Sequence, residues 1–176
     1  MTYQDIITRL ENWREVRRIS IDDQIKGLYT NLVEEIDEFT RAKVLGNKDE
    51  MIDALCDISI FCYNTLTPEY AYGLKRIILA KYSNFPLWIL DSIVEATDFI
   101  GEALKFNVDL AKSVIPFILY RCARLINDLG YDYLECMDET LKEIESRTGH
   151  WDEVRGKFIK DNRGSYTADY SRCKFK

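Results

Sequence analysis

Residues that disrupt helices are scarce in this sequence. Only 8 glycines and 3 prolines occur among 176 residues, and both residue types are unfavourable inside a helix. The shortage favours helices over turn-rich β structure. Hydrophobic residues make up 47% of the chain and charged residues 31%, a balance that is typical of globular proteins and argues against disorder. We expect one domain with a sizeable core.

Histidine is almost absent, since His150 is the only one. This excludes sites that need two histidines, such as those of HD-type phosphohydrolases and HExxH proteases. The five cysteines form no CxxC pair, and most of them lie inside apolar runs. They are Cys56, Cys62, Cys122, Cys136 and Cys173. We interpret them as reduced core residues and therefore expect a cytoplasmic protein.

The sequence also lacks long apolar runs and an excess of basic residues. No segment has the pattern of a membrane span or a secretion signal, so we expect no membrane partner. The formal net charge is -6, whereas nucleic-acid binders usually carry a basic face. We therefore expect no nucleic acid polymer as a partner. An acidic chain can still bind phosphate groups if a cation mediates the contact.

Apolar residues at helical spacing predict an all-α fold without a convincing strand. The predicted helices cover residues 3–18, 22–45, 49–65, 70–82, 86–105, 108–129 and 132–147. Pro116 should kink the helix over 108–129 or mark its true start. We expect residues 148–176 to form an extended tail that wraps back on the body. The predicted architecture is an antiparallel bundle of about six helices with this tail.

A weak internal similarity relates residues 32–39 (LVEEIDEF) to residues 93–100 (IVEATDFI). Most acidic residues of the first segment have no counterpart in the second. Two explanations stay open, namely a degenerate second half over residues 86–147 and a chance similarity between two amphipathic helices. No low-complexity linker divides the chain, so we assign residues 1–176 to a single domain.

Acidic residues are predicted on the buried sides of two helices within residues 22–65. At about 100° per residue, Glu35 falls on the apolar stripe of the first helix, Glu38 at its margin and Glu34 further out. Asp53 and Asp57 are four residues apart, so they share one face of the second helix. The neighbours on that face are Ile60, Phe61 and Asn64.

Folding these two helices about Gly46 brings the carboxylates into two facing rows. Like charges about 5 Å apart repel by roughly 1 kcal/mol in water and about 3 kcal/mol at an effective dielectric near 20. Burial adds a desolvation cost, so protons or a cation must compensate the charge. Carboxylates on rigid helices suit Mg²⁺ or Mn²⁺ rather than zinc. The alternative is a solvated acidic face that pairs with lysines.

Two short motifs resemble those of a known enzyme family. EEIDE at residues 34–38 has the form EExxE, and DALCD follows at residues 53–57 after a short turn. Together they resemble the MazG-like all-α nucleoside triphosphate pyrophosphohydrolases, which include dimeric dUTPases and phosphoribosyl-ATP pyrophosphohydrolases. The clear resemblance covers residues 24–62. A weaker one, to the tail of phage-encoded members, covers residues 129–174.

The resemblance implies Mg²⁺-dependent hydrolysis of a nucleoside triphosphate, such as a dNTP, to the monophosphate and pyrophosphate, with Mn²⁺ as an alternative metal. It implies that Glu35, Glu38, Asp53 and Asp57 hold the metal, and that Glu34 or Glu35 accepts a proton from the attacking water. It also implies a homodimer or homotetramer.

One departure concerns the second motif, whose common form in the family is ExxD. Ala54 stands where the glutamate would be, and Glu50-x-x-Asp53 is an alternative match. The ligand set therefore stays open at these positions.

Basic and aromatic residues complete the predicted site. The candidates that neutralise the leaving pyrophosphate are Arg147, Lys157, Lys160 and Lys26, and a solvated basic tail is the alternative. The candidates that stack on the base are Trp13, Phe39, Phe61 and Tyr166. Two other functions stay open, namely an activity like that of phosphoribosyl-ATP pyrophosphohydrolase and a metal-free helical interaction module.

Overall fold

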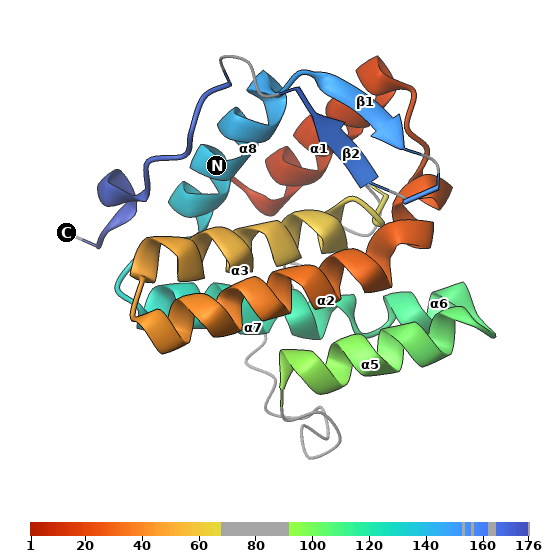
Figure 1. The fold of residues 1–176 in the computed structure, drawn as a ribbon, viewed down its shortest axis with the longest axis horizontal. Coiled ribbons are helices and arrows are strands. Elements are labelled where there is room, and N and C mark those ends of the chain that lie inside the picture. The colour runs from red at the N-terminus through yellow and green to blue at the C-terminus, as the bar shows by residue number, and fades with distance from the viewer. Residues whose placement is uncertain (68–91, 153, 156, 162–164, 176) are drawn as a thin grey trace.

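The chain is mainly helical in the computed structural model, which describes residues 1–67, 92–152, 154–155, 157–161 and 165–175 (Figure 1). This confirms the predicted all-α class. The helices are α1 (Tyr3–Arg17), α2 (Ile21–Leu45), α3 (Lys48–Tyr63), α5 (Ile93–Leu104), α6 (Val108–Lys112), α7 (Ile115–Asp128) and α8 (Tyr133–Ser146). The helix predicted over 70–82 lies outside the described residues.

The long pair α2 and α3 begins and ends at residues suited to those positions. Ser20 caps α2 in a capping box with Asp23, which satisfies amide groups at the helix start. Gly46 ends α2 with a φ of 70°, a left-handed conformation that glycine adopts at little cost. Asn47 then caps α3. Because the connection is so short, α2 and α3 run antiparallel and pack closely together.

One of the predicted helices needs correction, and another is described only in part. The helix predicted over 108–129 is divided into α6 and α7, and Pro116 lies in the first turn of α7. Proline suits a first turn, where its missing N–H is not needed, but disrupts a helix interior. Pro116 thus marks a true start. Of the helix predicted over 86–105, residues 86–91 lie outside the described residues, and α5 begins at Ile93 after the capping residue Ser92.

The tail contains two short strands, which corrects the prediction that no strand forms. Strand β1 (Gly149–Asp152) pairs antiparallel with β2 (Lys157–Lys160), and Trp151 lies opposite Phe158. The chain then returns along α8 and ends in the short 3-10 helix η2 (Tyr170–Cys173). The amide of Asp132 donates to the carbonyl oxygen of Cys173 over 2.7 Å. The predicted tail that wraps back on the body is therefore confirmed.

Two groups of helices share one core. Figure 1 shows α2, α3, α5 and α7 gathered together, with α1 and α8 lying side by side beyond α3 and the β hairpin near them. Fully buried side chains from both groups form the hydrophobic core, among them Leu10, Leu32, Ile58, Tyr63, Ile118 and Leu141. All five cysteines are buried and free of disulfides, as expected for core residues.

None of the helices in the described ranges combines the length and the apolar character that a membrane span needs.

Candidate active site

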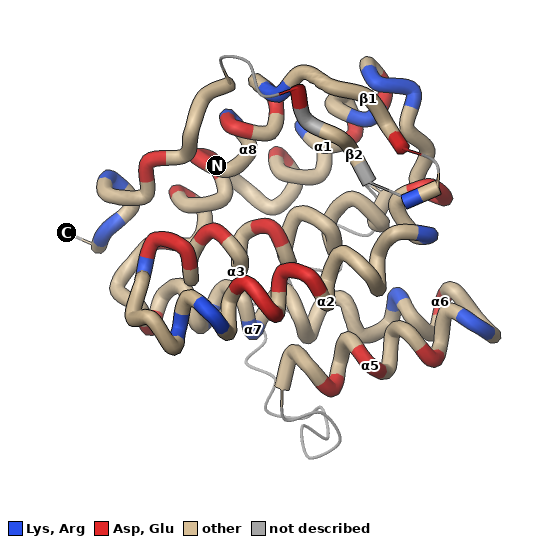
Figure 2. The backbone as a smooth tube through the Cα atoms, viewed as in Figure 1, with Lys and Arg blue, Asp and Glu red and all other residues tan. Residues whose placement is uncertain are grey.

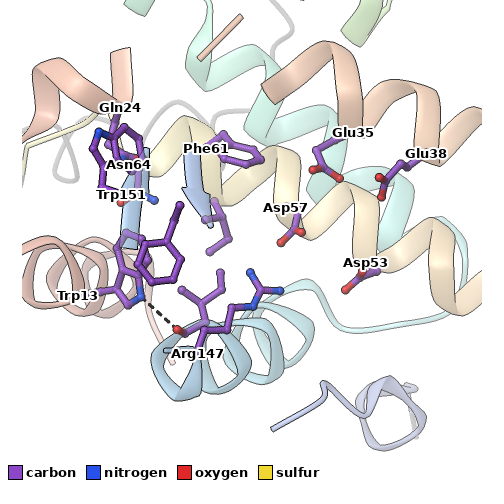
Figure 3. Close-up of a pocket in the computed structure, with 13 residues that line it drawn as sticks. Trp13, Gln24, Glu35, Glu38, Asp53, Asp57, Phe61, Asn64, Arg147 and Trp151 are labelled. Carbon is purple, nitrogen blue, oxygen red and sulfur yellow. Dashed lines mark hydrogen bonds between the residues drawn. The ribbon is translucent and has the colours of Figure 1, made fainter. Parts of the chain in front are cut away.

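A cavity of about 210 Å³ lies where α2 and α3 meet the end of α8 and the β hairpin. Its lining is charged in one part and aromatic in another (Figure 3). The lining residues are Trp13, Gln24, Glu35, Glu38, Asp53, Asp57, Ile60, Phe61, Asn64, Ile144, Arg147, Trp151 and Phe158.

The four carboxylates predicted to hold a metal all line this cavity. Glu35 and Glu38 come from α2, and Asp53 and Asp57 come from α3. Figure 2 shows acidic positions gathered along neighbouring stretches of these two helices. Glu35 is only 7% exposed, although its side chain is acidic. The two facing rows expected from helical periodicity are thus present.

The two alternative acids lie elsewhere. Glu34 is exposed on α2 and is not among the lining residues. Glu50 is exposed in the first turn of α3 and does not line the cavity either. Asp53 and Asp57 therefore lie at the cavity, whereas Glu50, the first residue of the alternative match, does not.

The carboxylates of the cavity meet part of what a divalent ion needs. Four carboxylates offer the oxygen ligands that Mg²⁺ and Mn²⁺ prefer. Among the described residues, however, no group of three His, Cys, Asp or Glu side chains is arranged to hold one ion. The carboxylates face one cavity without converging on one point. Their chemistry fits a hard cation, and binding would require the long Glu35 and Glu38 side chains to adjust.

Arg147 is the only cationic residue among the described residues that line the cavity. Its Nη2 donates to Glu143 Oε1 over 2.6 Å, whereas its buried Nε has no hydrogen-bond partner. Its carbonyl oxygen accepts a hydrogen bond of 2.7 Å from Arg17. Arg147 is therefore fixed at the end of α8, with donor capacity left for a ligand.

The other predicted cations do not share this position. Lys26 is exposed, pairs with Asp23 over 3.2 Å and does not line the cavity. Lys157 and Lys160 belong to β2, but their side chains lie outside what the structure describes. The phosphate-binding prediction is thus supported by position for Arg147 alone.

Aromatic residues line the other part of the cavity. Trp13 and Phe61 were predicted as base contacts and do line it, together with Trp151 and Phe158 from the β hairpin. The ring centroids of Trp13 and Phe158 lie 5.3 Å apart in an edge-on arrangement. The indole nitrogen of Trp13 donates to the carbonyl oxygen of Ile144 over 3.1 Å, which fixes this ring.

The other two aromatic candidates lie away from the cavity. Phe39 packs against the hydrophobic core. Tyr166 donates its hydroxyl to Glu139 on α8.

Two amide side chains lie beside the aromatic residues. Gln24 is 6% exposed, and its Nε2 has no hydrogen-bond partner. Asn64 Oδ1 accepts from the buried Arg14 over 2.9 Å. Because a guanidinium only donates, this bond orients the Asn64 carbonyl oxygen towards Arg14 and its amide nitrogen away from it. An unsatisfied buried donor is costly, so the Gln24 amide is suited to receive an acceptor atom from a ligand.

Sequence reasoning missed contacts between the tail and the acidic residues. The hydroxyl of Tyr170 donates to Asp53 Oδ1 over 2.7 Å and lies 3.0 Å from the hydroxyl oxygen of Thr140. Burial, followed by the neighbouring Cys56 and Asp53, raises the pKa of Tyr170 well above its ordinary value. Tyr170 therefore stays protonated and remains a donor to Asp53.

Some of the missed residues left signals in the sequence. Gln24 lies four residues before Leu28, so it shares the apolar stripe of α2. Trp151 and Phe158 left no such signal, because they face the same side only through the pairing of β1 with β2.

Comparisons of the chain with family models, with curated proteins and with solved structures find no match.

Proposed function

We propose that this chain is a divalent-metal-dependent pyrophosphohydrolase that converts a nucleoside triphosphate to the monophosphate and pyrophosphate. One observation carries the proposal. A single cavity joins four carboxylates and an arginine to a patch of aromatic and amide side chains. Such a division suits a ligand with a charged end and a flat, polar, aromatic end. The EExxE motif and the DALCD motif, which contain these four carboxylates, support the proposal through their resemblance to a known family.

The acidic wall needs a cation before it can accept a triphosphate. Carboxylates alone would repel the ligand, and the repulsion grows as water is excluded. Glu35, Glu38, Asp53 and Asp57 are the residues that would hold Mg²⁺ or Mn²⁺. When bound, the metal would neutralise phosphate charge and polarise a phosphoryl oxygen.

Glu35 is the better of the two candidates for the general base, since it lines the cavity and Glu34 does not. The water oxygen forms a bond to the α-phosphorus as its proton passes to a Glu35 carboxylate oxygen. The bond between the α-phosphorus and the bridging oxygen breaks. Its electron pair leaves with the pyrophosphate, and Glu35 later returns the proton to solvent.

The cationic and aromatic walls serve the two ends of the substrate. Arg147 donates hydrogen bonds to the leaving pyrophosphate, and loss of one such donor typically costs 10²–10³-fold in rate. Trp13, Phe61 and the hairpin aromatics enclose the base. Gln24 and Asn64 present amide N–H groups that can donate to acceptor atoms of the base.

The test is a substrate panel in Mg²⁺ with H₂¹⁸O. The panel contains the ribonucleoside and deoxyribonucleoside triphosphates, dUTP and phosphoribosyl-ATP. We expect stoichiometric pyrophosphate, with ¹⁸O found in the monophosphate because water attacks the α-phosphorus. Release of inorganic phosphate, or ¹⁸O in the pyrophosphate, would contradict the proposed bond cleavage. No hydrolysis and no heat on Mg²⁺ titration would favour the metal-free interaction module instead.

A further inference from the structure

The C-terminal segment 166–173 docks along α8 through contacts made by two acidic residues of that helix. Glu139 Oε2 accepts from the hydroxyl of Tyr166 and, over 3.3 Å, from the amide of Asp169. Glu143 Oε2 accepts from the amide of Ala168 over 2.9 Å. Glu139 and Ala168 are both at least partly buried. Hydrogen bonds to charged groups are among the stronger ones in proteins, so this docking is specific.

At its end, the segment reaches the acidic wall of the cavity. Tyr170 is 5% exposed, and its hydroxyl donates to Asp53 Oδ1 over 2.7 Å. An ionised carboxylate only accepts, so the hydroxyl proton of Tyr170 is committed to Asp53. The Thr140 hydroxyl oxygen lies 3.0 Å from the Tyr170 oxygen, while the Thr140 proton is donated to the carbonyl oxygen of Cys136 over 3.0 Å. Asp53 is thereby tied to α8 through the tail.

The same segment also reaches the cationic wall. Glu143 binds the tail amide of Ala168 with one oxygen and Arg147 with the other, over 2.6 Å. Asp53 and Arg147 face the same cavity from different helices. Segment 166–173 therefore contacts Asp53 directly, through Tyr170, and Arg147 indirectly, through Glu143.

We propose that segment 166–173 is a positioning element of the proposed active site, in which Tyr170 holds Asp53 in the orientation that binds the metal. The inference rests on the proposed function. Residues outside the ligand set that hydrogen-bond to a ligand fix its rotamer, and their loss typically weakens metal binding or activity 10- to 100-fold. Tyr170 does this from 117 positions away in the sequence.

The decisive variant is Tyr170→Phe, which keeps the buried ring and removes only the hydroxyl. Isothermal titration with Mn²⁺ should give a Kd about 10- to 100-fold higher than that of the wild type. Hydrolysis should recover when Mn²⁺ is raised above the new Kd, a rescue that a purely structural defect would not show. The matched control is Ser171→Ala, because this hydroxyl lies in the same turn and bonds Asp169 instead. It should retain the wild-type Kd.

Two outcomes overturn the inference in distinguishable ways. A folded Tyr170→Phe variant with the wild-type Kd would reject the role of Tyr170 and leave the proposed function standing. A wild-type chain that binds no Mn²⁺ would reject both. If Tyr170→Phe fails to fold by circular dichroism, a crystal of the wild-type chain grown with Mn²⁺ decides the matter. Asp53 bound to the ion while its Oδ1 still accepts from the Tyr170 hydroxyl would support the inference, and Asp53 turned away from Tyr170 when the ion is bound would reject it.

Discussion

Two pairs of helices, α2 with α3 and α5 with α7, differ in what they bury, although the first helix of each pair starts in the same way. Both α2 and α5 begin with a serine capping box, at Ser20 and Ser92. Glu35 in α2 lines the cavity, whereas the position aligned with it in α5 is the fully buried Ala96. The second helices of the two pairs differ in the same way. Two aspartates of α3 line the cavity, whereas α7 has no acidic residue before Asp128.

The difference shows what each pair contributes. α5 packs against α2, and α7 packs against α3, so the apolar pair supports the acidic pair from the side away from the hairpin. An apolar interior is stable without a ligand, whereas grouped carboxylates need a counter-charge. The apolar pair thus acts as a scaffold and the acidic pair forms the site, whether or not the two pairs arose by duplication.

The largest effect should come from removing one carboxylate on the acidic side only. Asp57→Asn should lower kcat/KM for the best nucleotide by about 1,000-fold, since several kcal/mol of transition-state stabilisation depend on the bound ion. Asp98→Asn on α5 is the matched control, because Asp98 is exposed. Its kcat/KM should equal that of the wild type. Equal losses in the two variants would erase the distinction between the helix pairs.

A smaller effect should follow when a charge is added to the apolar side. Ala96→Glu places a carboxylate at a fully buried position and should lower the free energy of unfolding by about 3 kcal/mol. Glu35→Gln keeps the shape and removes one of the mutually repelling charges, so it should raise metal-free stability, by about 1 kcal/mol. Urea unfolding followed by circular dichroism measures both. If Ala96→Glu were as stable as the wild type, α5 would tolerate the same chemistry as α2.

The smallest effect concerns pH and the tail. Burial alone would raise the pKa of Glu139, but hydrogen bonds from Lys142, Tyr166 and the Asp169 amide hold it below the ordinary 4.5. Its contribution is therefore present above about pH 4.5 and is lost as pH falls through the lower, folded pKa. Glu139→Gln should cost about 1–2 kcal/mol near pH 7.

The difference between Glu139→Gln and the wild type should shrink below pH 4.5, as measured by urea unfolding at several pH values. A difference that stays constant with pH would show that the charge of Glu139 does not hold the tail.

The sequence was most informative where neighbours along the chain determine the structure. Helical periodicity placed Glu35, Asp53 and Asp57 on buried faces, and the short connection at Gly46 brought those faces together. Contacts between distant segments could not be predicted in this way. The bond from Tyr170 to Asp53 depends on the path of the whole tail, and no local pattern specifies that path.

Short elements were also hard to predict. Four-residue strands such as β1 and β2 carry too few alternating residues to stand out from an irregular tail. The division of α6 from α7 was foreseen as one of two options because proline leaves only a kink or a start.

We propose that carboxylates of α2 and α3 bind one or more divalent ions in the same cavity. The decisive experiment is anomalous diffraction from a crystal grown with Mn²⁺ and a non-hydrolysable nucleotide. We expect a manganese peak about 2.2 Å from oxygen atoms of Glu35, Glu38, Asp53 and Asp57, with Asp53 Oδ1 still bonded to Tyr170. A well-ordered nucleotide bound elsewhere, with these carboxylates turned into solvent and no peak between the helices, would contradict it.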